Sequence, residues 1–138
     1  MSPIFVDANV FLYAIGGPHP LREPCRRAVE GIVRRKVAAE ISVEVVQEVA
    51  HVRNRGRGDG TARAREILAW KLRLHGFGPS DLEPALGLVD EHPGLPTRDA
   101  IHAATALNRG VKEILSADKD FDRLEGLARI DPSEIVSD

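Results

Sequence analysis

The sequence predicts an α/β layer fold, with a mainly parallel central sheet flanked by helices. Short segments rich in β-branched residues alternate along the chain with longer segments of helical periodicity, which is the pattern of a parallel sheet with crossover helices. The chain has 138 residues, a length that suits one domain over residues 1–138. Its hydrophobic fraction of 43% is ordinary for a globular protein.

Four short apolar segments have the composition of buried strands. The first contains Ile4-Phe5-Val6 between Pro3 and Asp7, and is too short to be assigned by periodicity. Its β-branched and aromatic content nevertheless favours a strand. On the same grounds, strands are expected over residues 3–7, 37–41, 113–117 and 127–130.

The segments between these strands are predicted to be helical, because glycine and proline clusters separate them and capping residues begin several of them. Ser42, Ser80 and Thr97 are the expected N-caps. The Gly/Arg-rich stretch 55–60 breaks the helical pattern, and Gly110 closes the last long helix. The expected helices cover residues 9–15, 21–36, 42–54, 61–75, 80–92 and 97–110, with a helical turn at 119–124.

Composition excludes several classes of protein. Cys25 is the only cysteine, so an internal disulfide framework and a cysteine-rich zinc site are excluded. No apolar run approaches the roughly 20 residues of a membrane span, and we expect a cytoplasmic protein. Residues 22–75 carry 13 Lys/Arg against 7 Asp/Glu, whereas residues 76–138 carry 6 against 13. A basic middle can attract polyanions and an acidic C-terminal part can collect cations.

Carboxylates stand at the positions where an α/β fold gathers ligands, beyond the C-terminal ends of the strands. Asp7 ends the first predicted strand, and Asp118 follows the strand of residues 113–117. Asp99 lies in the first turn of a helix, and Glu48 lies within the Ser42 helix. Taken singly, each acid has a structural explanation as a cap or a salt-bridge partner.

Taken together, these four carboxylates predict a metal site, provided that they converge. Each pair of charges about 4 Å apart repels by roughly 4 kcal/mol at an effective dielectric constant near 20. A hard divalent cation such as Mg²⁺ or Mn²⁺ relieves that repulsion, because it prefers oxygen ligands. Such a site suits hydrolysis of a phosphodiester, since the metal polarises phosphoryl oxygen and activates water.

Four motifs in order along the chain resemble those of the PIN-domain family, specifically the VapC-type ribonuclease toxins of prokaryotic toxin–antitoxin pairs. The likeness spans nearly the whole chain, and it implies a PIN-like three-layer fold. The motifs are Val6-Asp7-Ala8-Asn9-Val10-Phe11-Leu12, Gln47-Glu48-Val49, Arg98-Asp99-Ala100-Ile101-His102-Ala103-Ala104-Thr105-Ala106 and Leu115-Ser116-Ala117-Asp118-Lys119-Asp120-Phe121-Asp122.

The resemblance implies that Asp7, Glu48, Asp99 and Asp118 form the acidic quartet of the catalytic site. It makes Asp7 and Asp99 the direct metal ligands. It assigns to Glu48 and Asp118 the holding of metal-bound waters or of a second ion. Glu44 shares a helix face with Glu48 and competes for its role.

The same resemblance assigns supporting roles to neighbouring polar residues. Asn9 and Ser116 would orient the carboxylates by hydrogen bonds. Asp122 is a candidate auxiliary acid, although both Asp120 and Asp122 stand close to Asp118. His102 is expected to be a hydrogen-bonded structural histidine and not a catalytic base.

The family also implies Mg²⁺-dependent or Mn²⁺-dependent cleavage of RNA, a homodimer, and neutralisation by a cognate VapB-type antitoxin. In that setting Arg53, Arg55 and Arg57 would hold RNA phosphates, which position RNA without reading its sequence. A solvated or antitoxin-facing surface explains these arginines equally well.

Three other functions stay open at this point. The first is a catalytically silent PIN scaffold that binds RNA or a protein partner, which the retention of all four acids disfavours. The second is a phosphatase of the haloacid dehalogenase type. Its motif requires an aspartate two residues after the first one, where this chain has Asn9. The third is a nuclease that acts on DNA.

Overall fold

The computed structural model describes residues 2–135 and contains one parallel sheet of five strands. The strand order is β3-β2-β1-β4-β5, so β1 lies at the centre of the sheet. Every neighbouring pair of strands is parallel, which confirms the predicted α/β class. The strands are β1 (Ile4–Val6), β2 (Ala39–Ser42), β3 (Arg73–His75), β4 (Glu113–Leu115) and β5 (Ala128–Ile130).

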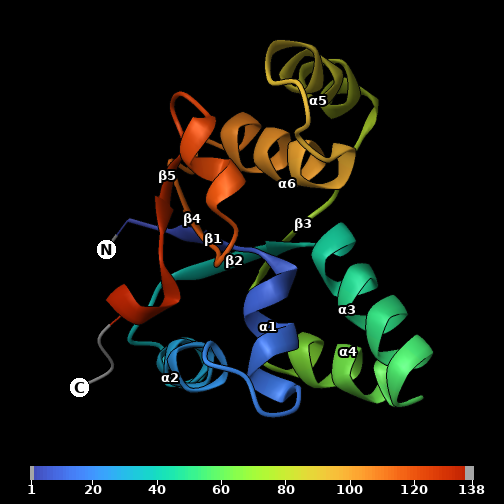
Figure 1. Ribbon diagram of the computed structural model, residues 1–138, viewed down its shortest axis with the longest axis vertical. Helices are drawn as coiled ribbons and strands as arrows, with labels where there is room; N and C mark the ends of the chain where they lie inside the picture. Colours follow the sequence, from blue (N-terminus) through green and yellow to red (C-terminus); the bar gives the residue numbers. More distant parts are fainter. Residues whose placement is uncertain (1, 136–138) are drawn as a thin grey trace.

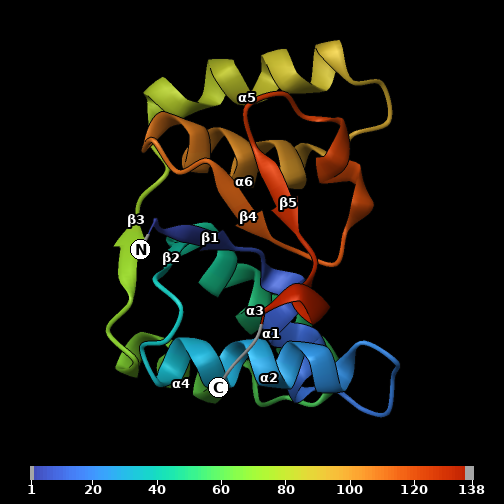
Figure 2. The same cartoon turned by 90° about the vertical axis from the view of Figure 1, so that its left-hand side faces the viewer.

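Helices cover both faces of the sheet, as the three-layer prediction requires. Helices α5 and α6 lie on one face, and α1 to α4 lie on the other (Figure 1). A view turned by 90° shows the same layers (Figure 2). No helix within residues 2–135 has the length and apolarity needed to cross a membrane. The helices are α1 (Ala8–Ile15), α2 (Arg22–Val33), α3 (Val43–Gly56), α4 (Gly60–Ala69), α5 (Pro79–Glu91) and α6 (Thr97–Asn108), followed by the short 3-10 helices η1 (Lys119–Arg123) and η2 (Pro132–Glu134).

Two helices end earlier than predicted because a residue just beyond each has a left-handed backbone. Helix α2 ends at Val33, and Arg35 has a φ of 62°. Helix α4 ends at Ala69, and Lys71 has a φ of 58°. A residue other than glycine is strained in this conformation, which a right-handed helix cannot include.

The strand β3 replaces the last turn of the predicted helix 61–75, so this part of the prediction was wrong. Its residues pair with β2 in the register Glu40↔Arg73 and Ser42↔His75. Arg73-Leu74-His75 is too short and too mixed in polarity to show the alternating pattern of a strand. The strand exists because β2 offers an unpaired edge.

The predicted helix caps are confirmed at one of three positions. The Ser42 hydroxyl accepts a hydrogen bond from the Val45 amide at 3.1 Å, as an N-cap should. Ser80 is not a cap, because α5 already begins at Pro79 and the Asp81 carboxylate accepts from the Gly78 amide at 2.8 Å. Thr97 is the first helical residue of α6, and Pro96 occupies the N-cap position.

The central strand pair sets up the functional edge of the sheet. Phe5 and Val6 of β1 lie opposite Ile114 and Leu115 of β4, and all four residues are buried. The ladder continues for one more bond, from the Asp7 amide to the Leu115 carbonyl at 3.0 Å. The residues that follow β1 and β4 therefore leave the sheet side by side.

Candidate metal centre and active site

The four acids predicted from the sequence come from four separate elements and meet at one edge of the sheet. Asp7 follows β1 and caps α1, and Asp118 follows β4 and precedes η1. Glu48 lies in α3, and Asp99 lies in the first turn of α6. The charges of Glu48 and Asp99 both interact with that of Asp7, and carboxylate oxygens of Asp99 and Asp118 lie within 4.8 Å of each other.

Asp7 is the most deeply buried of these acids, with only 4% of its surface exposed. Its Oδ1 accepts from the Ala8 amide at 2.8 Å, and its Oδ2 accepts from the Ser116 hydroxyl at 2.7 Å. The Nε2 atom of His102 lies 4.0 Å from Oδ1. A buried carboxylate requires such partners, since an unpaired charge is costly inside a protein.

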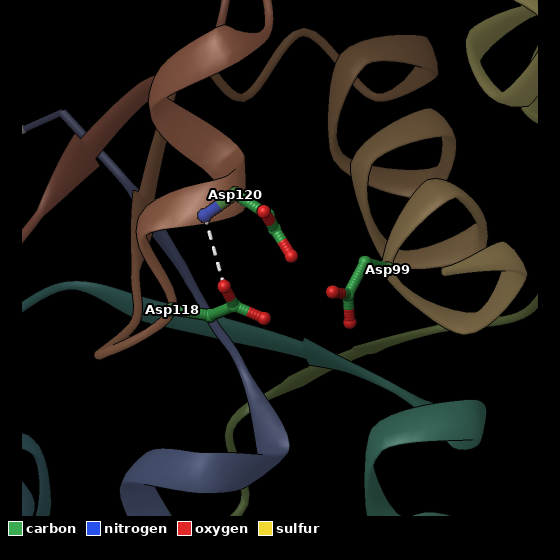
Figure 3. Close-up of side chains that lie close together, drawn as sticks. All are labelled: Asp99, Asp118 and Asp120. Atoms are coloured by element: carbon green, nitrogen blue, oxygen red, sulfur yellow. Dashed lines mark hydrogen bonds between the residues drawn. The ribbon is translucent and has the colours of Figure 1, made fainter. Parts of the chain in front are cut away.

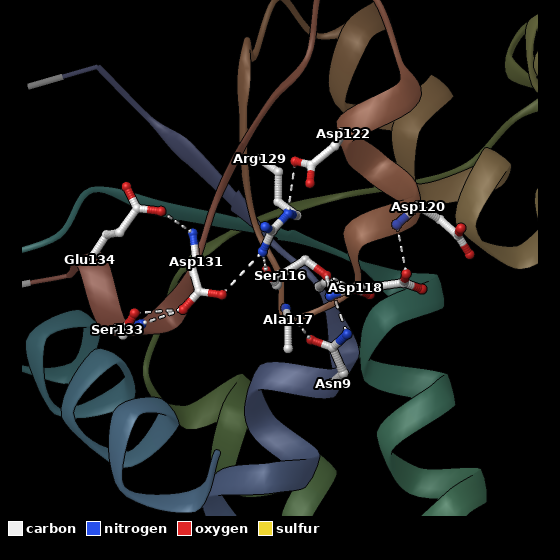
Figure 4. Close-up of polar contacts among 11 residues, drawn as sticks. Asn9, Ser116, Ala117, Asp118, Asp120, Asp122, Arg129, Asp131, Ser133 and Glu134 are labelled. Carbon is white, nitrogen blue, oxygen red and sulfur yellow. Dashed lines mark hydrogen bonds and ion pairs between the residues drawn. The ribbon is translucent and has the colours of Figure 1, made fainter. Parts of the chain in front are cut away.

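Ser116 connects three parts of the site through one hydroxyl group. While donating to Asp7, its Oγ accepts from the Asn9 amide nitrogen at 3.2 Å and from the Asp118 backbone N–H at 3.0 Å. The side-chain oxygen of Asn9 accepts in turn from the Ala117 backbone N–H at 3.3 Å (Figure 4). The structure thus places Asn9 and Ser116 where they can orient the acids.

A group of three carboxylates adjoins this network and shares Asp118 with it. Oxygen atoms of Asp99, Asp118 and Asp120 lie within 4.8 Å of one another. Figure 3 shows the three side chains pointing toward one another from α6 and from the segment that follows β4. The Asp118 carboxylate also accepts from the Asp120 amide at 2.9 Å. The sequence shows only that Asp120 is close to Asp118 along the chain. The structure places Asp120 within the acidic cluster.

Asp122 faces a different partner. Its carboxylate pairs with the Arg129 guanidinium at 2.9 Å, and its side chain is 52% exposed. Arg129 also donates to the Ser116 carbonyl at 3.0 Å and pairs with Asp131 at 3.2 Å (Figure 4). The turn of η1 thus directs Asp120, and not Asp122, toward Asp99.

Glu48 is held by a histidine that the sequence had marked as structural. The His102 Nε2 atom lies 3.0 Å from Glu48 Oε1, and only 1% of His102 is exposed. This contact confirms a hydrogen-bonded histidine at position 102. The Arg98 Nε atom lies 3.7 Å from the same glutamate oxygen and adds a peripheral positive charge.

The electrostatics of the cluster show an excess of negative charge. Burial raises the pKa of Asp99 to about 7, with further contributions from the neighbouring Asp118 carboxyl group and from the charge of Asp7. Burial also raises the pKa of Asp7, although His102 and the Ser116 hydroxyl oppose this rise. The donor set consists of carboxylate oxygens, which suits a hard divalent cation. The residues present therefore fit a metal of this kind.

The predicted RNA-binding arginines lie on α3 and just beyond it, toward the C-terminal end of α1. Arg53 pairs with Asp59 at 2.8 Å and is mostly buried, whereas Arg55 and Arg57 are exposed. Arg53 and Arg57 line a pocket of about 580 Å³ together with Arg22, Arg63 and Asp59. This arrangement makes a concave basic surface, on which Arg53 serves partly as a structural ion-pair partner.

Comparison with known proteins assigns the chain to one family. The family model "PIN domain" matches residues 4–127. The chain therefore belongs to the PIN domain family. Within it, the chain is 36% identical over 132 residues to ribonuclease VapC7 of Mycobacterium tuberculosis, covering 94% of this chain and 91% of that one. It is also 36% identical to ribonuclease VapC23 of that species over 117 residues, covering 83% and 92%.

Solved structures share the same fold. Mycobacterium tuberculosis VapC20, described as a sarcin-ricin loop cleaving toxin, superposes with a TM-score of 0.73 at 20% identity and covers 86% of this chain and 92% of its own. VapBC2 from Rickettsia felis, bound to a fragment of promoter DNA, gives a TM-score of 0.70 at 16% identity and covers 94% and 98%. At these identities the likeness concerns the fold alone.

Proposed function

We propose that this protein is a metal-dependent endoribonuclease and the toxin of a VapBC-like toxin–antitoxin pair. The observation that carries the proposal is the meeting of Asp7, Glu48, Asp99 and Asp118 at one edge of the sheet. The curated relatives are named ribonucleases, which gives the substrate class. A dense carboxylate cluster is costly without a counter-ion, so function explains it better than stability does.

Asp7 and Asp99 are the proposed direct ligands of Mg²⁺, with Mn²⁺ as the alternative ion, and Asp118 and Glu48 complete the catalytic set. When bound, the ion supplies positive charge to the phosphodiester and makes water a stronger nucleophile. Asp120 lies close enough to Asp99 and Asp118 to contribute a further oxygen.

The protein's own residues hold this set in place. The hydroxyl of Ser116 fixes one oxygen of Asp7 and the backbone of Asp118, and Asn9 fixes Ser116. The His102 nitrogen that contacts Glu48 also lies 4.0 Å from Asp7 Oδ1, so one imidazole ring stands close to both acids. With these bonds made, the carboxylates need little reorganisation when they receive a cation and a phosphate, which is the advantage of a preorganised site.

The exposed Arg55 and Arg57 are proposed to hold RNA phosphates away from the cut bond. Arg53 contributes less, because Asp59 already neutralises part of its charge. Phosphate contacts of this kind supply affinity and register and do not read sequence.

The proposed partners are a VapB-type antitoxin and a second copy of this chain, acting in the cytoplasm. Solved structures of the same fold include a toxin–antitoxin complex from Klebsiella pneumoniae, which supports an antitoxin partner. A basic side chain from the antitoxin, inserted into the acidic cluster, would replace the charge of the cation.

The test is the variant Asp99→Asn, which keeps the shape of the side chain and removes its charge. We expect the variant to cleave RNA with Mg²⁺ about 100-fold more slowly or worse, and to lose growth inhibition. Adding EDTA to the wild type should reduce RNA cleavage to the same extent. The control is Asp90→Asn, at an exposed position of α5, which should cleave like the wild type. If folded wild type and Asp99→Asn behave alike on every RNA, the protein is instead a silent scaffold.

A further inference from the structure

A recess lies directly beside the acidic cluster, and its lining residues other than Glu48 and His102 have no role in the chemistry proposed above. It has a volume of about 220 Å³ and is lined by residues of α3 and α6. Glu48 and His102 form its boundary with the acidic cluster. A group bound in this recess would therefore lie next to the bond that is cut.

The remaining lining residues combine hydrogen-bonding groups of both kinds with an apolar surface. Glu44 provides a carboxylate, and Arg98 provides a guanidinium on a side chain that is 60% exposed. Ile101 provides half-buried apolar surface, while Gln47 and His51 are exposed. This combination differs from the nearby cluster, which consists almost entirely of carboxylates.

Glu44 has an unused hydrogen-bonding capacity at this place. Its Oε1 atom is buried and accepts no hydrogen bond from any group within residues 2–135. A buried acceptor without a partner is uncommon, because leaving it unpaired costs free energy. Glu44 does not take the role of Glu48 either, because Glu48 is the glutamate that contacts His102 and interacts with Asp7.

We propose that this recess binds the guanine base adjoining the cut phosphodiester, and that Glu44 determines the specificity for it. The inference rests on the proposed ribonuclease function and deepens it by naming the sequence requirement. Proteins recognise single-stranded RNA by splaying bases out, stacking them on planar side chains and reading their edges. The ring of His51 is a planar group suited to such stacking.

Guanine is the base that fits this set of donors and acceptors best. Its Watson–Crick edge presents two adjacent N–H donors, on N1 and on the exocyclic N2, which match a carboxylate. Its O6 and N7 atoms are acceptors, which match a guanidinium. A recess that holds Glu44 and Arg98 together offers a partner for each edge. No other RNA base presents two donors side by side.

To test this inference, wild type and Glu44→Gln are each incubated with a random RNA library and Mg²⁺. The ends of the cleaved RNAs are then sequenced. We expect wild type to prefer guanine about tenfold at one position beside the cut, and Glu44→Gln to reduce that preference to about twofold or less. Glu83→Gln, an exposed glutamate of α5, is the matched control and should keep the wild-type profile.

A substrate change gives a second test that does not depend on how a variant folds. Replacing that guanine by hypoxanthine removes only the exocyclic amine, and should slow wild type about tenfold while leaving Glu44→Gln unaffected. A wild type that cleaves without base preference, or a profile that Glu44→Gln leaves unchanged, overturns this inference and leaves the ribonuclease standing. A wild type that cleaves no RNA overturns both.

Discussion

At the scale of single residues, Asp7 has both a structural and a chemical role. It caps α1 by accepting the Ala8 amide, and the same carboxylate accepts the hydroxyl of Ser116. Burial raises the pKa of Asp7, and the hydrogen bonds from Ser116 and Ala8 oppose this rise. A residue placed in this way couples the start of a helix to the geometry of the site.

Ser116→Ala should therefore damage stability and activity together. The variant removes the donor to Asp7 and the acceptor for Asn9 and for the Asp118 amide. We expect a loss of about 1–3 kcal/mol in the free energy of unfolding, measured with urea, and at least a tenfold loss of RNA cleavage.

Ser80→Ala is the matched control, since Ser80 is exposed and does not cap α5. It should change the free energy of unfolding by less than about 0.5 kcal/mol. Equal effects of the two serine variants would contradict the importance of the Ser116 network.

The sequence predicts the positions of Asp7 and Asp118 well, because each follows a short apolar strand and parallel strands end at a common edge. It does not predict the pairing of Glu48 with His102, which joins residues 54 positions apart. Nor does it separate Asp120 from Asp122, because the backbone of η1 decides which carboxylate faces Asp99. Catalytic roles for these acids stay predictions until the variants are measured.

At the scale of elements, the packing of α5 on α6 depends on one buried ion pair. Asp81 of α5 is 1% exposed and accepts from Arg109 Nη1 at 2.5 Å and from the Asn108 amide at 2.7 Å. The Arg109 guanidinium, followed by Asn108, holds the pKa of Asp81 well below its usual range. Arg109 also donates to the Gly76 carbonyl, which connects the pair to the loop after β3.

This pair should make the protein sensitive to acid. A carboxyl group whose pKa is lower in the folded state stabilises the fold fully above about pH 4, and this stabilisation is lost as the pH falls further. Asp81→Asn should cost about 3 kcal/mol at pH 7, because it leaves Arg109 without its partner.

Urea unfolding between pH 7 and pH 2.5 checks this prediction. The stability of Asp81→Asn should fall less steeply below pH 4 than that of the wild type. Asp90→Asn serves as the exposed control on the same helix. Parallel pH profiles for wild type and Asp81→Asn would show that the pair does not govern acid stability.

The strand β3 shows why some elements escape prediction. Ser42 and its helix follow from local chemistry, since a serine before an amphipathic segment satisfies the first free amides. The three residues of β3 carry no such local signal, and their conformation depends on β2 and on the left-handed Lys71. Local patterns therefore predict the helices and the buried strands, and the edge strand needs the assembled sheet.

At the scale of the whole molecule, the acidic cluster and the basic pocket lie near opposite ends of helix α1. The basic pocket with Arg22 and Arg57 lies at the C-terminal end of α1, whereas Asp7 stands at the N-terminal end of this helix. Eight residues of helix separate them, or roughly 12 Å. In the proposed function, an RNA strand places one phosphate among the acids and a more distant phosphate among the arginines.

Arg57→Glu should weaken RNA binding more at low salt than at high salt. Electrostatic contacts to phosphates release counter-ions, so losing one contact lowers the slope of log affinity against log salt by about one. Fluorescence anisotropy with a single-stranded RNA, in EDTA to prevent cleavage, measures this slope.

Arg27→Glu provides the control at an exposed position of α2 outside the pocket. A loss of affinity in Arg57→Glu that does not depend on salt would exclude a phosphate contact. A loss shared by both variants would point to overall charge and away from a local site.

The hydrogen bond between Ser116 and Asp7 joins residues 109 positions apart, and β4 can join β1 only after both strands have been synthesised. A growing chain that has not yet reached Asp118 lacks one acid of the site and the strand that positions it. Any enzymatic activity is therefore postponed on the ribosome until this segment has emerged and paired with β1.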